Sequence, residues 1–298
     1  MFIKPKVTVL AHSGQFHADD VFAVATLCLL LEDSRRINIV RTRDDSLIQK
    51  AEYVVDVGGV YDPDKNRFDH HQIGGAGKRD NGVPYASFGL VWMKYGTKIC
   101  RSEKVSTSID QKLVQPIDAS DNGVAISTRV FEKVSHFDVQ SLIRSMNPDW
   151  MESHVGIDKI FLSAVEFAKK IISREIKLAS DNVLGEGLVF DAYNKSEDKR
   201  IVVFDTQLPW EQVISKFPEP LYVIFPKESG WRIKAVRNEA DGFENRKNFP
   251  ASWAGKRSPE LSMLTGVPGG IFCHNNLFVA EAQTKEGALA MARIATDA

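Results

Sequence analysis

The stretch AHSGQFHADD, residues 11–20, follows the short run Val7-Thr8-Val9-Leu10. A continuous, largely apolar run of this length is typical of a strand that is buried on both faces of a sheet. Asp19 or Asp20 can cap a helix, because apolar residues recur at a spacing of three to four between Val21 and Leu31. The stretch therefore predicts a buried strand, a polar turn and a helix, in that order.

A second polar stretch starts at Asp56 and ends with Asp-His-His at residues 69–71. Residues 37–40 and 53–57 read as two further strands, so the first part of the chain has the alternation of a parallel βαβ sheet. Ligands of such sheets gather at the carboxyl ends of the strands. Because His12 and Asp56 each follow an apolar run directly, we expect both side chains at this edge.

Length and composition set broad limits on the protein. A chain of 298 residues with 43% hydrophobic content can form two domains with substantial cores. The net charge is −1, so any binding of a polyanion must come from a local basic patch. Three widely spaced cysteines argue against a disulfide framework and a cysteine-rich zinc site, and fit a reducing compartment.

Nothing in the sequence predicts a membrane partner. The apolar run at residues 21–31 is too short to span a bilayer. Residues 1–10 have neither a signal-peptide layout nor the character of a transit peptide. We therefore expect a cytoplasmic protein, with an organellar location after processing left open.

The rest of the chain predicts further helices and strands in two groups. Helices are expected at 86–95, 105–117 and 157–178, and Pro116 should end or kink the second of them. Polar residues and glycines at 180–187 interrupt the helical pattern, which places a domain boundary there. The second group has strands at 201–204, 221–225, 231–236 and 277–280, and helices at 210–217, from 258 onward and at 286–295. We therefore predict an α/β fold of two domains, residues 1–182 and 183–298.

Imidazoles and carboxylates are concentrated in and near the two polar stretches. The residues are His12, His17, Asp19, Asp56, Asp69, His70, His71, Asp118 and Asp121. This mixture suits Mn²⁺, Fe²⁺, Zn²⁺ or, with more carboxylates, Mg²⁺. One ion rarely needs so many ligands, whereas two ions that share a carboxylate would use them in a phosphoryl displacement. Taken singly, each residue has an ordinary explanation, such as a helix cap at Asp19, but the group as a whole favours a metal site.

These motifs resemble those of the DHH phosphoesterase superfamily. More narrowly, the whole chain resembles the melanocyte proliferating gene family of DHH-type exonucleases. The matching segments are residues 12–20, 56–63, 68–72, 118–123, 243–247, 253–257, 269–274 and 284–293. The resemblance implies a DHH-type metal-binding catalytic domain with a parallel sheet, followed by a smaller mixed-sheet domain that binds substrate.

The resemblance also implies a role for each matching residue of the first domain. One ion would be held by His12, His17 and Asp56. A second ion would be held by Asp19, Asp56, His70 and one of Asp118 and Asp121, with a preference for Asp118. His17 stands where the wider superfamily more often has Asp, and the added imidazole favours Mn²⁺ over Mg²⁺. His71 would polarise the substrate phosphate or protonate the leaving group, and Asp69 would orient an imidazole or cap a turn.

In the second domain, the glycine-histidine motif resembles a substrate-binding motif. Gly269 and Gly270 would let the backbone approach a phosphate, and His274 would donate a hydrogen bond to it. Arg232, Arg237 and Arg246 form a candidate basic patch beside tryptophans that could stack on bases. An ordinary charged edge strand explains the same pattern.

The function that the resemblance implies is that of a dinuclear-metal-dependent phosphodiesterase, acting as a 3′-to-5′ exonuclease on single-stranded RNA or a short oligonucleotide. One alternative is a phosphohydrolase of a small substrate such as pyrophosphate or a dinucleotide, which the near-neutral charge suits equally well. Another is a non-catalytic metal- or nucleotide-binding protein. A homo-oligomer is compatible with each of these functions.

Overall fold

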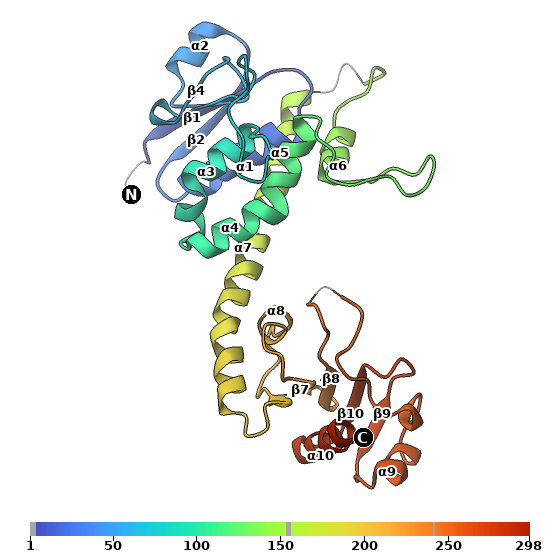
Figure 1. Ribbon diagram of the computed structural model, residues 1–298. Coiled ribbons are helices and arrows are strands. Elements are labelled where there is room, and N and C mark those ends of the chain that lie inside the picture. The colour runs from blue at the N-terminus through green and yellow to red at the C-terminus, as the bar shows by residue number, and fades with distance from the viewer. Residues whose placement is uncertain (1–3, 153–155, 241) are drawn as a thin grey trace. The chain divides into compact units, whose positions relative to one another are not determined.

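The computed structural model describes residues 4–152, 156–240 and 242–298. The chain divides into two compact units, Met1–Ser180 and Asp181–Ala298 (Figure 1). Each unit has its own five-stranded sheet with helices packed against it. The predicted α/β fold class is confirmed at this level.

The sheet of the first unit has the order β2-β1-β3-β5-β4. Four strands run parallel: β1 (Lys6–Ala11), β2 (Arg36–Arg41), β3 (Tyr53–Val55) and β5 (Arg67–Phe68). The edge strand β4 (Tyr61–Asp62) is antiparallel to β5. Central parallel strands are covered on both faces, which explains why β1 is apolar without alternation.

Helix α1 (Ala18–Leu31) is the central helix of the first unit. Every residue from Ala18 to Cys28 is buried, so the helix is apolar nearly all round apart from two aspartates at its start. It packs against α3 (Ser87–Cys100), with the rings of Phe22 and Phe88 5.6 Å apart. The other helices are α2 (Asp45–Lys50), α4 (Glu103–Ile109), α5 (Gln115–Asp121) and α6 (Val139–Ser145), with a short 3-10 turn at Pro63–Lys65.

Pro116 does not end its helix, contrary to the sequence-based expectation. A π-helical segment, Asp110–Val114, lies between α4 and α5, and Pro116 falls in the first turn of α5. The helical backbone is continuous across this point, with the Gln115 N–H donating to the Asp110 carbonyl, so the π-helical segment is the irregularity that lets the helix pass through a proline. The helix therefore continues through Asp118 to Asp121.

Helix α7 (Ile157–Lys195) is longer than expected, since it passes through residues 180–187 without a break. The boundary between the two units falls within this helix. A glycine costs a helix about 1 kcal/mol relative to alanine, which a helix of 39 residues can absorb. Among the residues that the structure describes, no helix is both long and apolar enough to cross a membrane.

The sheet of the second unit has the order β6-β7-β8-β10-β9. Strands β6 (Ile201–Val203) and β7 (Tyr222–Lys227) are parallel, while β8 (Gly230–Ala235), β10 (Val279–Ala282) and β9 (Gly270–Cys273) continue antiparallel. Helices α8 (Glu211–Ile214), α9 (Glu260–Thr265) and α10 (Lys285–Asp297) complete the unit, with a 3-10 turn at Ala251–Trp253. The sequence analysis did not predict β9.

Candidate metal centre

Three neighbouring strands of the first unit end side by side. Ala11 pairs with Val55, and Val55 pairs with Phe68. The next residues along the three strands are therefore His12, Asp56 and Asp69. The carboxyl ends of parallel strands thus bring an imidazole and two carboxylates to one edge of the sheet. His12 and Asp56 were expected there, whereas the strand that ends before Asp69 was not predicted.

Asp56 faces two histidines at once. Its Oδ2 atom lies 3.4 Å from Nε2 of His12, and its Oδ1 atom lies 3.4 Å from Nε2 of His70. The backbone at Asp56 is left-handed, with φ of 56°, and the Ser87 hydroxyl donates to Oδ1 at 3.2 Å. Uncommon backbone conformations of this kind are often found at functional sites. The two oxygens of one carboxylate are thus directed to two different groups of ligands.

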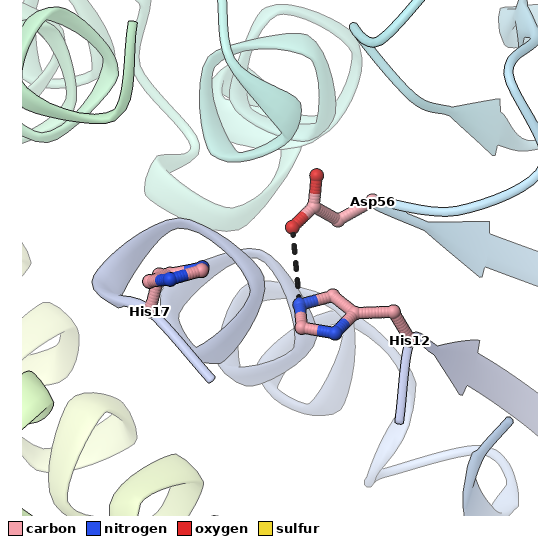
Figure 2. Close-up of side chains that lie close together, drawn as sticks. All are labelled: His12, His17 and Asp56. Carbon is pink, nitrogen blue, oxygen red and sulfur yellow. Dashed lines mark ion pairs between the residues drawn. The ribbon is translucent and has the colours of Figure 1, made fainter. Parts of the chain in front are cut away.

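The first group contains His12, His17 and Asp56, whose ligand atoms lie within 4.8 Å of one another (Figure 2). Nδ1 of His12 lies 3.1 Å from the carbonyl oxygen of Ser13, so Nδ1 carries the proton. Its Nε2 atom faces Asp56 and also Oδ2 of Asp20, at 3.2 Å. A neutral imidazole would direct the lone pair of Nε2 at these oxygens. A proton or a cation between them would remove the resulting repulsion.

His17 precedes the first turn of α1 and enters the site from there. Its ring centroid lies 6.0 Å from that of His12. The carboxylate of Asp20 accepts hydrogen bonds from the N–H groups of His17 and Val21 at 2.8 and 3.0 Å. Asp20 therefore caps α1 and fixes the backbone that carries His17.

The second group contains Asp19, His70 and Asp121, again within 4.8 Å of one another. Both oxygens of Asp19 accept backbone N–H groups at the start of α3, from Ser87 at 3.0 Å and Phe88 at 2.6 Å. Nε2 of His70 lies 3.2 Å from Oδ2 of Asp121. Helix α3 thus holds one ligand candidate with its N-terminal N–H groups, which favour a carboxylate there.

Asp121, and not Asp118, lies in this group, which corrects the preference for Asp118. The Asp118 carboxylate is fully buried and binds the Gly89 N–H at 2.9 Å and Nη1 of Arg79 at 2.8 Å. Burial outweighs these partners and raises the pKa of Asp118 to about 7. Its two oxygens lie against the Gly89 N–H and the Arg79 guanidinium, while Oδ2 of Asp121 faces His70.

His71 differs from His70 in being open to solvent, with 61% of its side chain exposed. The ring donates from Nδ1 to Oδ1 of Asp69 at 2.7 Å, and the other oxygen of Asp69 accepts the Gly59 N–H at 2.5 Å. Asp69 therefore fixes the tautomer and orientation of His71. The free Nε2 atom of His71 is available to a substrate.

The electrostatics of the two groups fit divalent cations. Burial lowers the pKa of His12, but the carboxylates of Asp20 and Asp56 outweigh it and raise the pKa to about 10. Burial likewise lowers the pKa of His70, and Asp121 and Asp56 raise it to about 11. Burial and the neighbouring carboxylates raise the pKa of Asp19 well above its usual range. Each raised pKa reflects several carboxylates buried close together, whose mutual repulsion a positive charge beside them reduces.

One atom tests this fit directly. Nε2 of His70 is buried and has no hydrogen-bond partner, although carboxylate oxygens lie 3.2 and 3.4 Å away. An orphaned buried nitrogen is rare in folded proteins and normally has a structural or chemical reason. The groups could therefore hold metal ions through imidazole and carboxylate ligands.

Comparison with known proteins gives the relationship of the chain. Residues 8–296 match the model of the MYG1 exonuclease family, described as Uncharacterised protein family (UPF0160). A MYG1 protein of Caenorhabditis elegans is 31% identical over 96% of this chain and 94% of its own length. The chain belongs to the MYG1 family. A MYG1 protein of Dictyostelium discoideum is also 31% identical, over 96% of this chain and 95% of its own length. The human MYG1 exonuclease is 29% identical, over 95% of this chain and 84% of its own length.

The predicted family is thus confirmed, whereas membership of the wider DHH superfamily stays a prediction. The family match covers both units of the chain. The residues predicted to bind substrate in this MYG1-family chain lie in the second unit, where the structure separates them into two sets.

Two predicted substrate residues, Arg232 and His274, line one cavity of the second unit. Its volume is about 700 Å³, and its aromatic lining includes Trp210, Phe225, Phe272 and Phe278. Nδ1 of His274 accepts the Asn276 N–H at 3.0 Å, which leaves the other ring nitrogen as a donor. Arg232 binds Glu281 at 2.8 Å through Nε, so its charge is largely neutralised.

The other predicted substrate residues lie outside the lining of this cavity. The guanidinium of Arg246 donates to the carbonyls of Ser215, Phe217 and Pro220, which corrects the expectation that it is available to substrate. Arg237 lies 5.6 Å over the ring of Phe243.

The two glycines are engaged by the fold. The Gly270 N–H donates to the Ser262 hydroxyl at 2.9 Å, and the Gly269 carbonyl accepts the Gln283 N–H at 2.8 Å. The sequence-based expectation of a phosphate at the Gly270 N–H thus competes with an existing hydrogen bond. As substrate residues, the two glycines stay a prediction.

Arg79, which contacts residues next to the candidate ligands, was not predicted from the sequence. Arg79 lies in the glycine-rich segment at residues 74–82, and it binds Asp110 at 2.7 Å and Asp118 at 2.8 Å. Its guanidinium also lies 4.2 Å over the ring of Tyr85. No local pattern identifies these contacts, because the partners come from separate helices.

Proposed function

We propose that this chain is a dinuclear-metal-dependent phosphodiesterase, acting as a 3′-to-5′ exonuclease on RNA. The observation that carries the proposal is the shared carboxylate of Asp56, with one oxygen toward His12 and the other toward His70. Two ions that share a ligand suit the in-line displacement of a phosphate ester. The human, rat, bovine and mouse relatives carry the name MYG1 exonuclease, which supports nuclease activity.

The ligand set favours Mn²⁺ and accommodates Mg²⁺. Three imidazoles, those of His12, His17 and His70, stand among the carboxylates of the two groups. Imidazole prefers transition metals, whereas an all-oxygen set would prefer Mg²⁺. When bound, the ions would lower the pKa of a water molecule and neutralise charge on the reacting phosphate. Asp56 would hold both ions at a fixed separation.

His71 is the proposed proton donor. Its Nδ1 proton is held by Asp69. In the imidazolium form the second proton, on Nε2, would pass to the leaving oxygen of the phosphate ester and leave a neutral imidazole. Asp19 and Asp121 would position the second ion, with Asp19 fixed by the first turn of α3. Each part of this scheme uses residues that are held in place by neighbours within the first unit.

The cavity of the second unit is the proposed substrate-binding site. His274 would donate a hydrogen bond to a phosphate oxygen, and the aromatic lining would contact a base. Arg232 contributes charge to the same cavity, while Gly269, Gly270 and Arg237 are weaker candidates for contact. These assignments follow the DHH-type resemblance of the second-unit motifs.

One observation favours the alternative of a short substrate, such as pyrophosphate or a dinucleotide. The two cations in the cavity are paired, Arg232 with Glu281 and Lys234 with Glu211 at 3.1 Å. A long polyanion would gain little from cations that are already neutralised. A short substrate would depend on the metal ions for most of its charge neutralisation.

Metal-dependent turnover by the full-length protein tests the proposal. The protein is stripped with a chelator, reloaded with Mn²⁺ or Mg²⁺, and offered single-stranded RNA labelled at either end, a dinucleotide and pyrophosphate. We expect shortening of RNA from its 3′ end, abolished by Asp56→Asn and His70→Ala. Asp64→Asn is the matched control, because Asp64 is exposed and belongs to neither of the two candidate ligand groups.

Each other outcome has a definite meaning. Hydrolysis of pyrophosphate or the dinucleotide with intact RNA would replace the leading function with the alternative. Stoichiometric metal binding without turnover of any phosphate ester would leave a non-catalytic binding protein. Full activity of Asp56→Asn would contradict the shared-carboxylate arrangement.

A further inference from the structure

The segment between α5 and α6, residues 122–138, stands apart from the rest of the first unit (green in Figure 1). It contains no helix or strand, and every one of its residues is exposed. Connections longer than about 12–15 residues without secondary structure are uncommon in compact domains and are usually functional or disordered. We call this segment the aromatic arm, for the two phenylalanines that it carries.

The aromatic arm exposes large apolar side chains to solvent. Phe131 and Phe137 are 71% and 74% exposed, and Val130 and Val134 are 82% and 60% exposed. A disordered linker is typically poor in such residues. Exposed apolar side chains that gather on one segment usually mark a contact surface.

The tip of the arm has its own hydrogen bonds. The Val134 N–H donates to the carbonyl of Phe131 at 3.4 Å, which closes a turn. Across this turn, Nη2 of Arg129 donates to the Ser135 hydroxyl at 2.9 Å. The aromatic side chains are therefore carried by an organised loop.

Both ends of the arm are attached to the metal centre. At one end, the arm begins directly after Asp121. At the other end it enters α6, where Gln140 accepts the Ala18 N–H at 2.8 Å. Asn147, just beyond α6, binds the N–H and the carbonyl of Phe16, each at 2.9 Å. These contacts hold the backbone on either side of His17, so both ends of the arm are anchored next to candidate ligands.

The cations of the arm lie next to its aromatic rings in the sequence. Arg129, Lys133 and His136 accompany the two phenylalanines. The acidic residues of the arm are Glu132 and Asp138, and Asp138 caps α6 by accepting the Ser141 N–H. Aromatic rings alternating with cations are the means by which proteins bind single-stranded nucleic acid, since bases stack on the rings and phosphates meet the cations. Close to a site rich in carboxylates, such cations also reduce the repulsion of a phosphate chain.

We propose that the aromatic arm is a stacking platform for the bases of a single-stranded nucleic acid whose end lies at the metal centre. The inference rests on the proposed function, and it adds a binding surface in the first unit to the cavity in the second. Phe131 and Phe137 stack on bases, and Arg129 and Lys133 contact the backbone of the strand.

Binding and turnover are measured separately, so that the two proposals can fail independently. The Kd of the full-length protein for a fluorescent single-stranded RNA is measured by anisotropy in chelator, where no turnover occurs. Phe131→Leu with Phe137→Leu keeps the apolar character but removes the rings, and should raise Kd at least about fivefold, since stacking of one base contributes about that much or more. Phe131→Tyr with Phe137→Tyr should bind as the wild type does, and Val134→Ala is the control for a non-aromatic change on the same loop.

Hydrolysis of bis(p-nitrophenyl) phosphate with Mn²⁺ reports the metal centre alone and should be equal in all variants. Unchanged RNA affinity of the leucine variant, or no RNA binding by the wild type, would overturn the arm proposal whatever the turnover. Loss of hydrolysis in the wild type would instead count against the proposed function. A dimer in light scattering that Phe131→Ser converts to a monomer, with RNA affinity unchanged, would assign the arm to a second copy of the chain and overturn the proposal.

Discussion

Gly89→Ala should disturb the support of the metal centre more than its small change in size suggests. Gly89 is buried in the first turn of α3. A Cβ atom at this position would lie 1.8 Å from Oδ2 and 2.7 Å from Cγ of Asp118, and 2.9 Å from Nη2 of Arg79. Asp118 cannot simply rotate away, because it is fully buried and held by both neighbours.

The magnitude follows from two contributions to the free energy of unfolding. Overpacking a buried site by one methyl group costs about 1–3 kcal/mol. Displacing Asp118 also weakens its hydrogen bond to the Gly89 N–H, and a bond to a charged group contributes about 1.5–3 kcal/mol. The sum is about 2.5–6 kcal/mol for the first unit. For a unit of this size that corresponds to a fall in Tm of at least about 5 °C.

Thermal unfolding of the metal-free protein, followed by circular dichroism, measures the effect. Gly187→Ala is the matched control, because Gly187 lies within helix α7 and a Cβ atom there would meet nothing within 4 Å. That change should leave Tm unchanged or raise it slightly, since alanine is the better helix former by about 1 kcal/mol. Metal affinity should also fall in Gly89→Ala, because the neighbouring N–H groups of α3 hold Asp19.

A double-mutant cycle with Asp118→Ala isolates the cause. Removing the Asp118 side chain removes the atoms that the new methyl group meets, so Gly89→Ala should cost much less in that background. Additive losses in the double variant would refute the reasoning. So would a Tm of Gly89→Ala within about 2 °C of the wild type, which is less than the smallest cost expected from overpacking.

Three further outcomes are expected. Binding of Mn²⁺ at pH 8 should release protons, because the pKa values of His12 and His70 lie near 10 and 11 and ligation requires neutral imidazoles. Affinity should therefore rise from pH 6 to pH 9, and equal binding heats in buffers of different ionisation enthalpy would contradict this. Asp121→Asn should weaken Mn²⁺ binding at least about tenfold more than Asp118→Asn in calorimetry, and the reverse order would restore Asp118 as the ligand. Asp69→Asn should lower kcat about a hundredfold with metal content unchanged, whereas loss of bound metal would make it a metal-site residue.

Local patterns in the sequence were sufficient to predict the edge of the sheet where the candidate ligands gather. His12 and Asp56 each follow a short apolar run, and a parallel strand that ends in a polar residue places that residue at the carboxyl edge. The start of α1 was predictable as well, since Asp20 in its first turn accepts the His17 N–H as part of a capping box. These features depend on residues close together in the chain, and they are visible without the fold.

The tertiary structure decided what each carboxylate of α5 contacts. Asp118 and Asp121 lie three residues apart on one helix, so spacing alone leaves both as candidates. Asp118 contacts Gly89 of α3 and Arg79. Asp121 lies beside His70 instead. The reason is that a helix fixes where a side chain starts, whereas its partners come from distant segments.

The arginines of the second unit also differ in ways that only the folded structure shows. Arg232, Arg237 and Arg246 looked alike as cations near tryptophans in the sequence. In the folded unit one pairs with a glutamate, one lies over an aromatic ring and one donates to three backbone carbonyls. The sequence by itself determined the strand ends and the residue types of the metal centre. Only the tertiary structure decided which charges are free to act, because a charge is neutralised by whatever the fold brings beside it.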